Sequence, residues 1–346
     1  MTFLLHSFGF NGFAQTTRNS GSTWLQTPGV KRVLLATWET TVIEKIDGSI
    51  EVWGYEPRQS TALWKDRKIS SIFGDPNTLL GVVDTQGTVW CADATKDPSV
   101  ATKLTSGAKQ AACCAIRGQV YVLYSSGEVQ CFTRFGDDDD KKLEFTSEKL
   151  SVPPVYSLAA SHTHILLYTA GWDPVYGRGS NRFSQLGQQD IGQECEAPAA
   201  IEFFAGLGLD QENGMVACGL FHSAVALAGD MYTFGWRKSG QLGWGVQDEH
   251  NDNGDDGIIR MPVFLDQDGQ QVEELHIVKV ACGSEHTVAI DDKGRVWTCG
   301  GNKYGQLGRT TEADHDPYFR LCTSYNGKAV DCHAGRWNTF ISTTAE

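Results

Sequence analysis

Short apolar segments separated by tight polar turns recur along the whole chain, and one pair of copies is especially similar. Residues 280–308 contain two short apolar runs, near Val288 and Val296, joined by a polar turn that includes Gly294. Residues 216–243 repeat the same order of runs and turns. Two such runs around an Asp-x-Gly-type turn predict a β-hairpin. No window carries a helical period of helical length, so strands of about four to six residues are predicted throughout.

More diverged copies bring the number of repeat units to seven. Alignment on one position gives a single equivalent residue in each unit: Thr41, Leu80, Val120, Ile165, Ser223, Thr287 and Thr339. Neighbouring equivalents are 39 to 64 residues apart. This spacing is typical of one propeller blade per unit with insertions in some units. Residues 244–276 are predicted to be an inserted loop between blades.

The two ends of the chain predict how the array closes. Residues 8–15 match only the second half of the repeat, whereas residues 332–341 match only its first half. If the ends meet, they assemble one blade together, and the ring has no long free edge. The prediction is an all-β fold: one domain over residues 1–346, a seven-bladed β-propeller whose N- and C-terminal strands share one blade.

The repeat resembles that of the regulator of chromosome condensation family. The resemblance is carried by residues 282–286 (Cys-Gly-x-x-His), 294–297 (Gly-x-Val-Trp) and 300–308 (Gly-x-Asn-x-x-Gly-Gln-Leu-Gly). Within that family the chain looks most like the small alpha-tubulin suppressor, or killer-toxin-insensitivity, type. This resemblance implies a non-enzymatic adaptor that supports tRNA wobble-uridine modification and diphthamide synthesis through a small zinc-binding electron-carrier protein.

Two other functions that the family resemblance implies stay open. One is guanine-nucleotide exchange on a Ran-like small GTPase, for which residues 244–276 are the candidate wedge. The other is a scaffold role beside a JmjC-type oxygenase, as in a second similar type of single-domain member. Repeats of this kind specify a fold better than a function, so the identity of the partner would separate the three alternatives.

Charge and cysteine usage restrict the partners and the compartment. The net charge is −13, with 29 Lys and Arg against 42 Asp and Glu, which disfavours direct binding to nucleic acid. Ten cysteines without a Cys-x-x-Cys pair are expected to be small core residues in a reducing cytoplasmic or nuclear setting. No stretch is long and apolar enough to span a membrane, and the N-terminus does not resemble a signal peptide.

Catalytic, metal and cofactor chemistry are not predicted. The chain contains no Gly-x-Ser-x-Gly elbow, no phosphate loop and no His-Glu-x-x-His pair. His164, His222, His286 and Asn338 occupy one repeat position, which predicts a structural hydrogen bond to backbone in each blade rather than a metal site. The acidic segments 137–140 and 248–256 are expected to be solvated loops, and either is suited to docking a basic partner.

The residues just before that repeated position are the candidate partner-binding residues. They are expected to project to one face around the central axis: Trp38, Glu39, Phe221, Glu285, Arg336 and Trp337. A ring of Trp, Phe, Arg and Glu has the composition of a protein-interaction hot spot. The same pattern is equally compatible with side chains that only seal adjacent blades. Trp172, Trp236 and Trp244 are expected to pack between blades.

Overall fold

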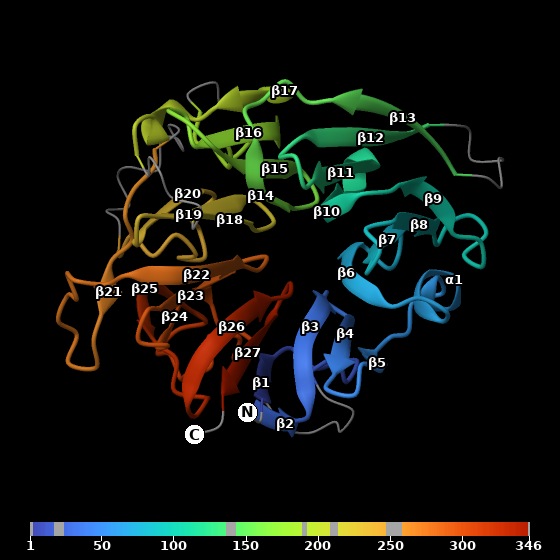
Figure 1. The fold of residues 1–346 in the computed structure, drawn as a ribbon. Helices are drawn as coiled ribbons and strands as arrows, with labels where there is room; N and C mark the ends of the chain where they lie inside the picture. The colour runs from blue at the N-terminus through green and yellow to red at the C-terminus, as the bar shows by residue number, and fades with distance from the viewer. Residues whose placement is uncertain are drawn as a thin grey trace.

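A ring of seven β-sheets builds the molecule. The computed structural model describes residues 3–16, 24–135, 143–188, 192–207, 214–246 and 258–344. Their strands form seven sheets around a central axis, and the innermost strands are β3, β6, β10, β14, β18, β22 and β26 (Figure 1). The predicted seven-bladed propeller is therefore confirmed.

Blades 1 to 4 follow the chain in simple antiparallel order. Blade 1 is β3 (Val30–Ala36), β4 (Thr40–Lys45) and β5 (Ile50–Gly54). Blade 2 is β6 (Ile69–Gly74), β7 (Leu79–Asp84), β8 (Val89–Asp93) and β9 (Thr102–Thr105). Blade 3 is β10 (Ala108–Cys114), β11 (Gln119–Tyr124), β12 (Val129–Phe135) and β13 (Glu144–Lys149). Blade 4 is β14 (Val155–Ala160), β15 (His164–Thr169), β16 (Val175–Ser180) and β17 (Glu194–Ala200).

Blade 5 keeps the three-stranded order of blade 1, whereas blades 6 and 7 depart from the simple order. Blade 5 has β18 (Met215–Cys218), β19 (His222–Leu227) and β20 (Asp230–Gly235). Blade 6 has β22 (Ile277–Cys282), β23 (His286–Asp291), β24 (Val296–Gly301), β25 (His315–Leu321) and an outer β21 (Phe264–Leu265). Blade 7 combines β26 (Lys328–Ala334) and β27 (Asn338–Thr344) with β1 (Phe3–Gly9) and β2 (Trp24–Pro28).

Among the described residues, three short helices lie outside the sheets: α1 (Ser60–Trp64) and the 3₁₀ turns η1 (Ala115–Arg117) and η2 (Glu202–Phe204). Leu63 of α1 is fully buried in the apolar cluster between blades 1 and 2. No helix among the described residues is both long and apolar enough to cross a membrane.

The aligned repeat position corresponds to one structural position. All seven residues used for the alignment are the second residue of the second strand of their blade, from Thr41 in β4 to Thr339 in β27. Even the diverged middle units keep this register, with Leu80 second in β7 and Val120 second in β11. The repeat register read from the sequence is therefore correct in every blade.

The hydrophobic core is divided among the contacts between blades. Each of the seven buried clusters in the described part of the chain joins two neighbouring blades. Between blades 5 and 6, for example, Met231 packs with Val280 and Trp297. A blade therefore buries its two faces only against its neighbours, and every blade contact is needed to close the ring.

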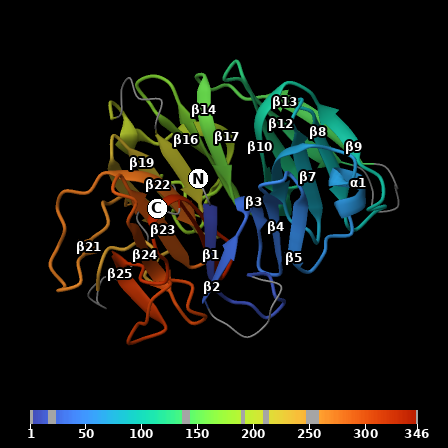
Figure 2. The same ribbon diagram turned by 60° about the horizontal axis from the view of Figure 1, so that its bottom comes forward.

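The two ends of the chain complete blade 7. β1 lies between β2 and β27, and β27 lies between β1 and β26. Phe3 pairs with Thr344 and Gly9 pairs with Asn338, so the two end strands align along their whole length. In Figures 1 and 2 the N- and C-terminal strands lie side by side next to β3. The predicted closure by a shared blade is confirmed.

Residues 258–276, the longer described part of the predicted insertion, are mostly bound to the blades. β21 pairs in parallel with β25, and the Phe264 ring stacks on Phe319 with centroids 4.8 Å apart. Arg260 and Thr233 form a bridge beside β20. This part of the segment extends blade 6 and covers the outer edge of blade 5, instead of forming a simple loop.

Candidate protein-binding face

The candidate binding residues lie at one end of the propeller. In each antiparallel blade, the loop between the first two strands and the segment after the third strand emerge at the same end. Trp38, Phe221, Glu285 and Trp337 are in loops that directly precede β4, β19, β23 and β27. We call this end of the molecule the loop face. The Asp-x-Gly turns are at the opposite end.

An aromatic group on the loop face crosses the closure of the ring. It consists of Phe10, Phe13, Trp38, Tyr304 and Trp337, called the seam cluster below. The Phe13 ring lies 5.1 Å from Trp38 and 6.1 Å from Phe10. The Phe10 ring lies 5.0 Å from Tyr304 and 6.1 Å from Trp337, mostly edge to face. The seam cluster therefore joins the residues after β1 to loops of blades 6, 7 and 1.

A repeated contact explains how these loop residues are held. The residue two positions before the Gln of each repeat tail reaches the loop of the following blade. Phe183 packs on Phe221 at 4.9 Å, and Tyr304 packs on Trp337 at 5.8 Å. At the equivalent place Ser239 Oγ donates to Glu285 at 3.1 Å.

These contacts mean that Phe221, Glu285 and Trp337 each touch the preceding blade, as the blade-sealing interpretation requires. All three side chains nevertheless keep part of their surface exposed. Sealing therefore accounts for only one side of each residue, and the other side still faces outward.

Two of the six candidates do not lie where an exposed ring requires them. Glu39 is buried, and its carboxylate accepts a hydrogen bond from Asn77 of blade 2. The expectation that Glu39 projects from the face is therefore wrong, because the neighbouring loop covers it. Arg336 instead extends across the axis, where its Nη2 lies 2.8 Å from His162 Nε2 of blade 4.

Asp75 of blade 2 completes this contact over the axis. Its Oδ2 lies 3.2 Å from His162 Nε2 and 3.6 Å from Arg336 Nη2. Burial acts to raise the pKa of the Asp75 carboxyl, but the His162 contact, the Asn77 backbone N–H and the Arg336 charge outweigh it and leave that pKa lowered. Asp75, His162 and Arg336 are called the axial cluster below.

Two hollows open on the loop face. A cavity of about 140 Å³ around the axis is lined by His162 and Arg336 of the axial cluster, together with Leu220 and Ser284. A groove of about 340 Å³ lies beside the seam cluster, where Glu285, Tyr304 and Trp337 line it with two rim lysines, Lys238 and Lys303. The groove therefore combines aromatic surface with charges of both signs.

The repeated histidines link neighbouring blades. His164, His222 and His286 each begin the second strand of their blade, as does Asn338. In each histidine Nε2 lies 2.9 Å from the hydroxyl of the next blade: Ser223, Thr287 and Thr339 respectively. Each hydroxyl in turn donates to a Gln carbonyl at 2.7 Å. The Nε2 side of each imidazole therefore reaches the backbone through a hydroxyl, rather than by the direct bond that the sequence predicts.

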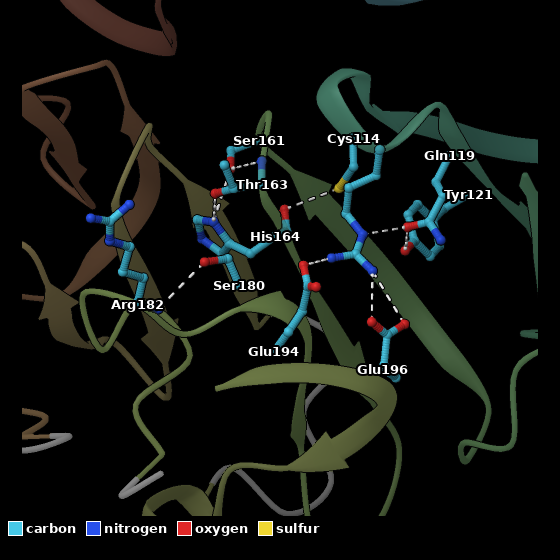
Figure 3. A network of polar contacts seen from close by, with 11 residues as sticks. Cys114, Gln119, Tyr121, Ser161, Thr163, His164, Ser180, Arg182, Glu194 and Glu196 are labelled. Carbon is cyan, nitrogen blue, oxygen red and sulfur yellow. Dashed lines mark hydrogen bonds and ion pairs between the residues drawn. The ribbon is translucent and has the colours of Figure 1, made fainter. Parts of the chain in front are cut away.

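This arrangement fixes the state of the rings. A carbonyl only accepts, so each hydroxyl donates to it and must accept from the Nε2–H of the histidine. Burial lowers the pKa of His164 and His222 to about 3 and that of His286 to about 4. Nδ1 of His164 meets Ser161 Oγ at 2.8 Å, and Figure 3 shows the two side chains together.

The other two histidines need glycine in place of Ser161. A Cβ at Gly219 would lie 2.2 Å from Cε1 of His222, and one at Gly283 would lie 2.2 Å from Cε1 of His286. Nδ1 of both rings is buried without a hydrogen-bond partner. The Cys-Gly-x-x-His element of the repeat is therefore architecture: the glycine makes room for the ring.

The contact between blades 7 and 1 lacks this link. Asn338 donates to the Thr37 carbonyl at 3.3 Å, while Asn338 Oδ1 and Thr41 Oγ1 are both buried without a partner. We expect Asn338→His to reach Thr41 and to raise the free energy of unfolding by about 1 kcal/mol at pH 8. Urea denaturation of N338H, T41V and N338H/T41V measures this gain. If the gain in free energy of unfolding persists in N338H/T41V, it does not come from a hydrogen bond to Thr41.

The other tryptophans occupy separate places. Trp236 packs on Phe221 at the loop face, and Trp244 Nε1 donates to Thr233 at 2.8 Å. Trp172 is 64% exposed in the turn between β15 and β16, at the end opposite to the loop face. The expectation of packing between blades therefore does not describe Trp172.

All ten cysteines are unpaired thiols, and seven of them are buried. Burial raises the pKa of the Cys282 thiol to about 12, which makes it a poor nucleophile at neutral pH. In the described ranges no group of three or more His, Cys, Asp or Glu is placed to hold a metal ion. The acidic segments 137–140 and 248–256 lie outside the described residues.

Sequence reasoning missed four residues of the loop face. Phe10, Phe13 and Tyr304 sit in the repeat tails, which were interpreted only as turns. Phe13 and Tyr304 are equivalent to Phe183 and Ser239, each two residues before a Gln, and this was a usable signal. Phe10 lies outside that pattern. Asp75 carried no such signal, because its partners His162 and Arg336 are brought to it only by the closed ring.

Comparison with known proteins identifies relatives of the repeat and of the whole ring. The regulator of chromosome condensation (RCC1) repeat matches residues 228–290 and 293–341. RCC1 domain-containing protein 1 of Homo sapiens is 32% identical over 217 residues, which cover 53% of this chain and 54% of that protein. The chain thus spans about half the length of this curated relative.

Two solved propellers match nearly the whole chain. Human WBSCR16 superposes with a TM-score of 0.75 at 15% identity and covers 99% of both chains. The structure of Kap60 bound to yeast RCC1 (Prp20) gives a TM-score of 0.72 at 13% identity and covers 98% of this chain and 88% of that chain. At these identities the two likenesses establish the fold alone.

Proposed function

We propose that this chain, which carries regulator of chromosome condensation repeats at residues 228–290 and 293–341, is a non-enzymatic propeller adaptor that binds a protein partner on its loop face. The observation that carries the proposal is the seam cluster. Five aromatic side chains from separate parts of the chain share one surface there, and Phe13 is 43% exposed. Partly exposed aromatic residues held rigidly in a group are typical of interaction hot spots.

The family resemblance suggests which partner this is. We infer a small zinc-binding electron-carrier protein, with the adaptor supporting tRNA wobble-uridine modification and diphthamide synthesis in the cytoplasm or nucleus. The strongly acidic balance of the chain agrees with a protein partner rather than a nucleic acid. The subtype resemblance to the small alpha-tubulin suppressor proteins remains part of this proposal.

Exchange on a Ran-like small GTPase is the second candidate function that the family resemblance suggests. Its candidate wedge was residues 244–276, and the described part of that segment is held against blades 5 and 6 by the Arg260 bridge and by β21. A wedge would therefore have to come from residues 247–257, outside the described part. A scaffold for a JmjC-type oxygenase would use the same loop face as the adaptor.

We expect Trp38→Ala combined with Trp337→Ala to weaken partner binding at least about tenfold while leaving the melting temperature within a few degrees of the parent. The two rings supply opposite ends of the seam cluster, so their removal flattens the surface without emptying a core. Calorimetric titration with the purified partner measures the loss. Trp172→Ala is the matched control, because it removes an exposed tryptophan from the opposite end.

The choice among partners needs purified candidates. A titration of the wild-type chain with the small zinc protein, with a Ran-like GTPase and with a JmjC-type oxygenase separates the three, and a nucleotide-release assay adds a direct readout for the second. Equal binding by the parent and by W38A/W337A, in every titration that detects a complex, would eliminate the seam cluster as the binding surface.

A further inference from the structure

The axial cluster connects three blades that are far apart in the ring. Asp75 follows β6 in blade 2, His162 precedes β15 in blade 4, and Arg336 precedes β27 in blade 7. The side chains are 12%, 28% and 33% exposed, respectively, so water reaches the cluster only in part. They meet at one end of the axial cavity, at the loop face. No blade contact described above requires this meeting.

A single ring nitrogen lies between the two charged groups. Nε2 of His162 is 2.8 Å from the Arg336 guanidinium, which only donates, and 3.2 Å from the Asp75 carboxylate, which only accepts. Without a proton, Nε2 accepts from Arg336 and faces the Asp75 oxygen with its lone pair. With a proton, Nε2 donates to Asp75 and opposes the guanidinium. Each state satisfies one contact and destabilises the other.

We propose that the axial cluster is a proton-controlled latch over the axis of the propeller. With His162 neutral, its Nε2 accepts from Arg336 and ties the loop of blade 7 to the loop of blade 4. With His162 protonated, the hydrogen bond passes to Asp75, and the guanidinium moves away from the imidazolium toward the loop face. The proton alone is gained or lost, from solvent, and no covalent bond changes.

Arg336 connects the axial cluster to the seam cluster on the candidate binding surface. Arg336 precedes Trp337 of the seam cluster, and the Arg336 carbonyl accepts from the backbone N–H of Ser284 at 3.0 Å in blade 6. Release of the guanidinium therefore adds a positive charge beside the seam cluster at acidic pH. That consequence rests on the proposed binding role of the loop face, whereas the latch itself is tested on the protein alone.

Other charged groups around the axis are engaged elsewhere. Glu39 of blade 1 contacts the cluster only through Asn77, and Glu285 of blade 6 bonds Ser239. On β26, His333 lies 3.4 Å from Asp331, which also meets Lys279 at 3.4 Å. Among the described residues, the groups in direct polar contact with the His162 ring are thus Asp75 and Arg336.

The test follows the ring and the guanidinium by NMR in the whole chain, with labelled histidine and arginine, from pH 8 down through the pH range in which the chain stays folded. In the wild type, the Arg336 side-chain signals are expected to shift with the same midpoint as the His162 ring. Asp75→Asn is expected to lower that midpoint by about one pH unit, and Arg336→Gln to raise it by about as much. His333 is the internal control, since its titration is expected to be unchanged in both variants.

Arg336 signals that stay constant while His162 titrates would overturn the latch, and so would a His162 midpoint that is the same in all three proteins. The wild-type measurement needs no substitution, so the proposal remains testable even if a variant fails to fold. Loss of partner binding in W38A/W337A bears on the loop face and leaves this result untouched, which keeps the two proposals separable.

Discussion

Acidification from pH 7 to pH 5 is expected to lower the free energy of unfolding by about 6 kcal/mol, a large part of the stability of a typical domain. The cause is the set of three buried histidines that link the blades. Burial lowers the pKa of His164, His222 and His286 to about 3, 3 and 4, against an ordinary value of 6.5. Each contributes about 2 kcal/mol to this loss.

The direction follows from where protons bind. Between the lowered pKa of the folded chain and the ordinary pKa of 6.5, the histidines bind protons in the unfolded chain but not in the folded chain. The stabilising contribution of these histidines is therefore complete above pH 6.5 and decreases as the pH drops toward 4. In two of the three rings, a proton added to Nδ1 would find no hydrogen-bond acceptor, because Nδ1 of His222 and of His286 is buried without a partner. Protonation is therefore coupled to opening of the blade contact.

Urea denaturation followed by tryptophan fluorescence at several pH values measures this loss. His222→Asn is the matched variant, because the chain itself uses Asn338 at the same repeat position. The variant is less stable at pH 7, but its stability is expected to fall about 2 kcal/mol less between pH 7 and pH 5. A pH dependence identical to that of the parent would refute the role of His222, whatever the absolute stability of the variant.

The features of the fold that local repetition encodes were predictable from sequence. The second strands begin where the repeat alignment put them, even at Leu79 and Gln119, where the motif residues are lost. A nearly continuous apolar run survives in both strands because each blade still has to bury both faces. The terminal half-repeats likewise predicted the shared blade, since neither half can be a sheet alone.

The candidate site was predicted less well, because its contacts depend on how blades face one another. Glu39 was expected to be exposed, but Asn77 of the next blade covers it, and no local pattern records that neighbour. Likewise, Arg336 was predicted to be a loop residue, yet its meeting with His162 requires the closed ring. Repeats fix what recurs in every blade, whereas a cluster over the axis depends on residues that differ between blades.

Removal of the last strand is expected to abolish folding altogether. A chain truncated before Asn338 loses β27, which lies between β26 and β1 and supplies apolar side chains to two blade contacts. Phe340 belongs to the cluster between blades 7 and 1, and Ile341 to the cluster between blades 6 and 7. Loss of two such buried side chains costs on the order of 5 to 10 kcal/mol, comparable to the stability of the whole domain.

A circular permutant tests whether this loss comes from an open ring or from an essential chain end. Phe3 and Thr344 are paired, so a short linker joins the ends, and new ends are made at Ser125–Ser126 between β11 and β12. The permutant keeps every strand and is expected to unfold in one cooperative transition near the parental melting temperature. The truncated chain is expected to show no such transition in calorimetry, because both blade contacts beside the gap lose their cores. A cooperative transition in the truncated chain, or none in the permutant, would mean that stability is local to the blades rather than a property of the closed ring.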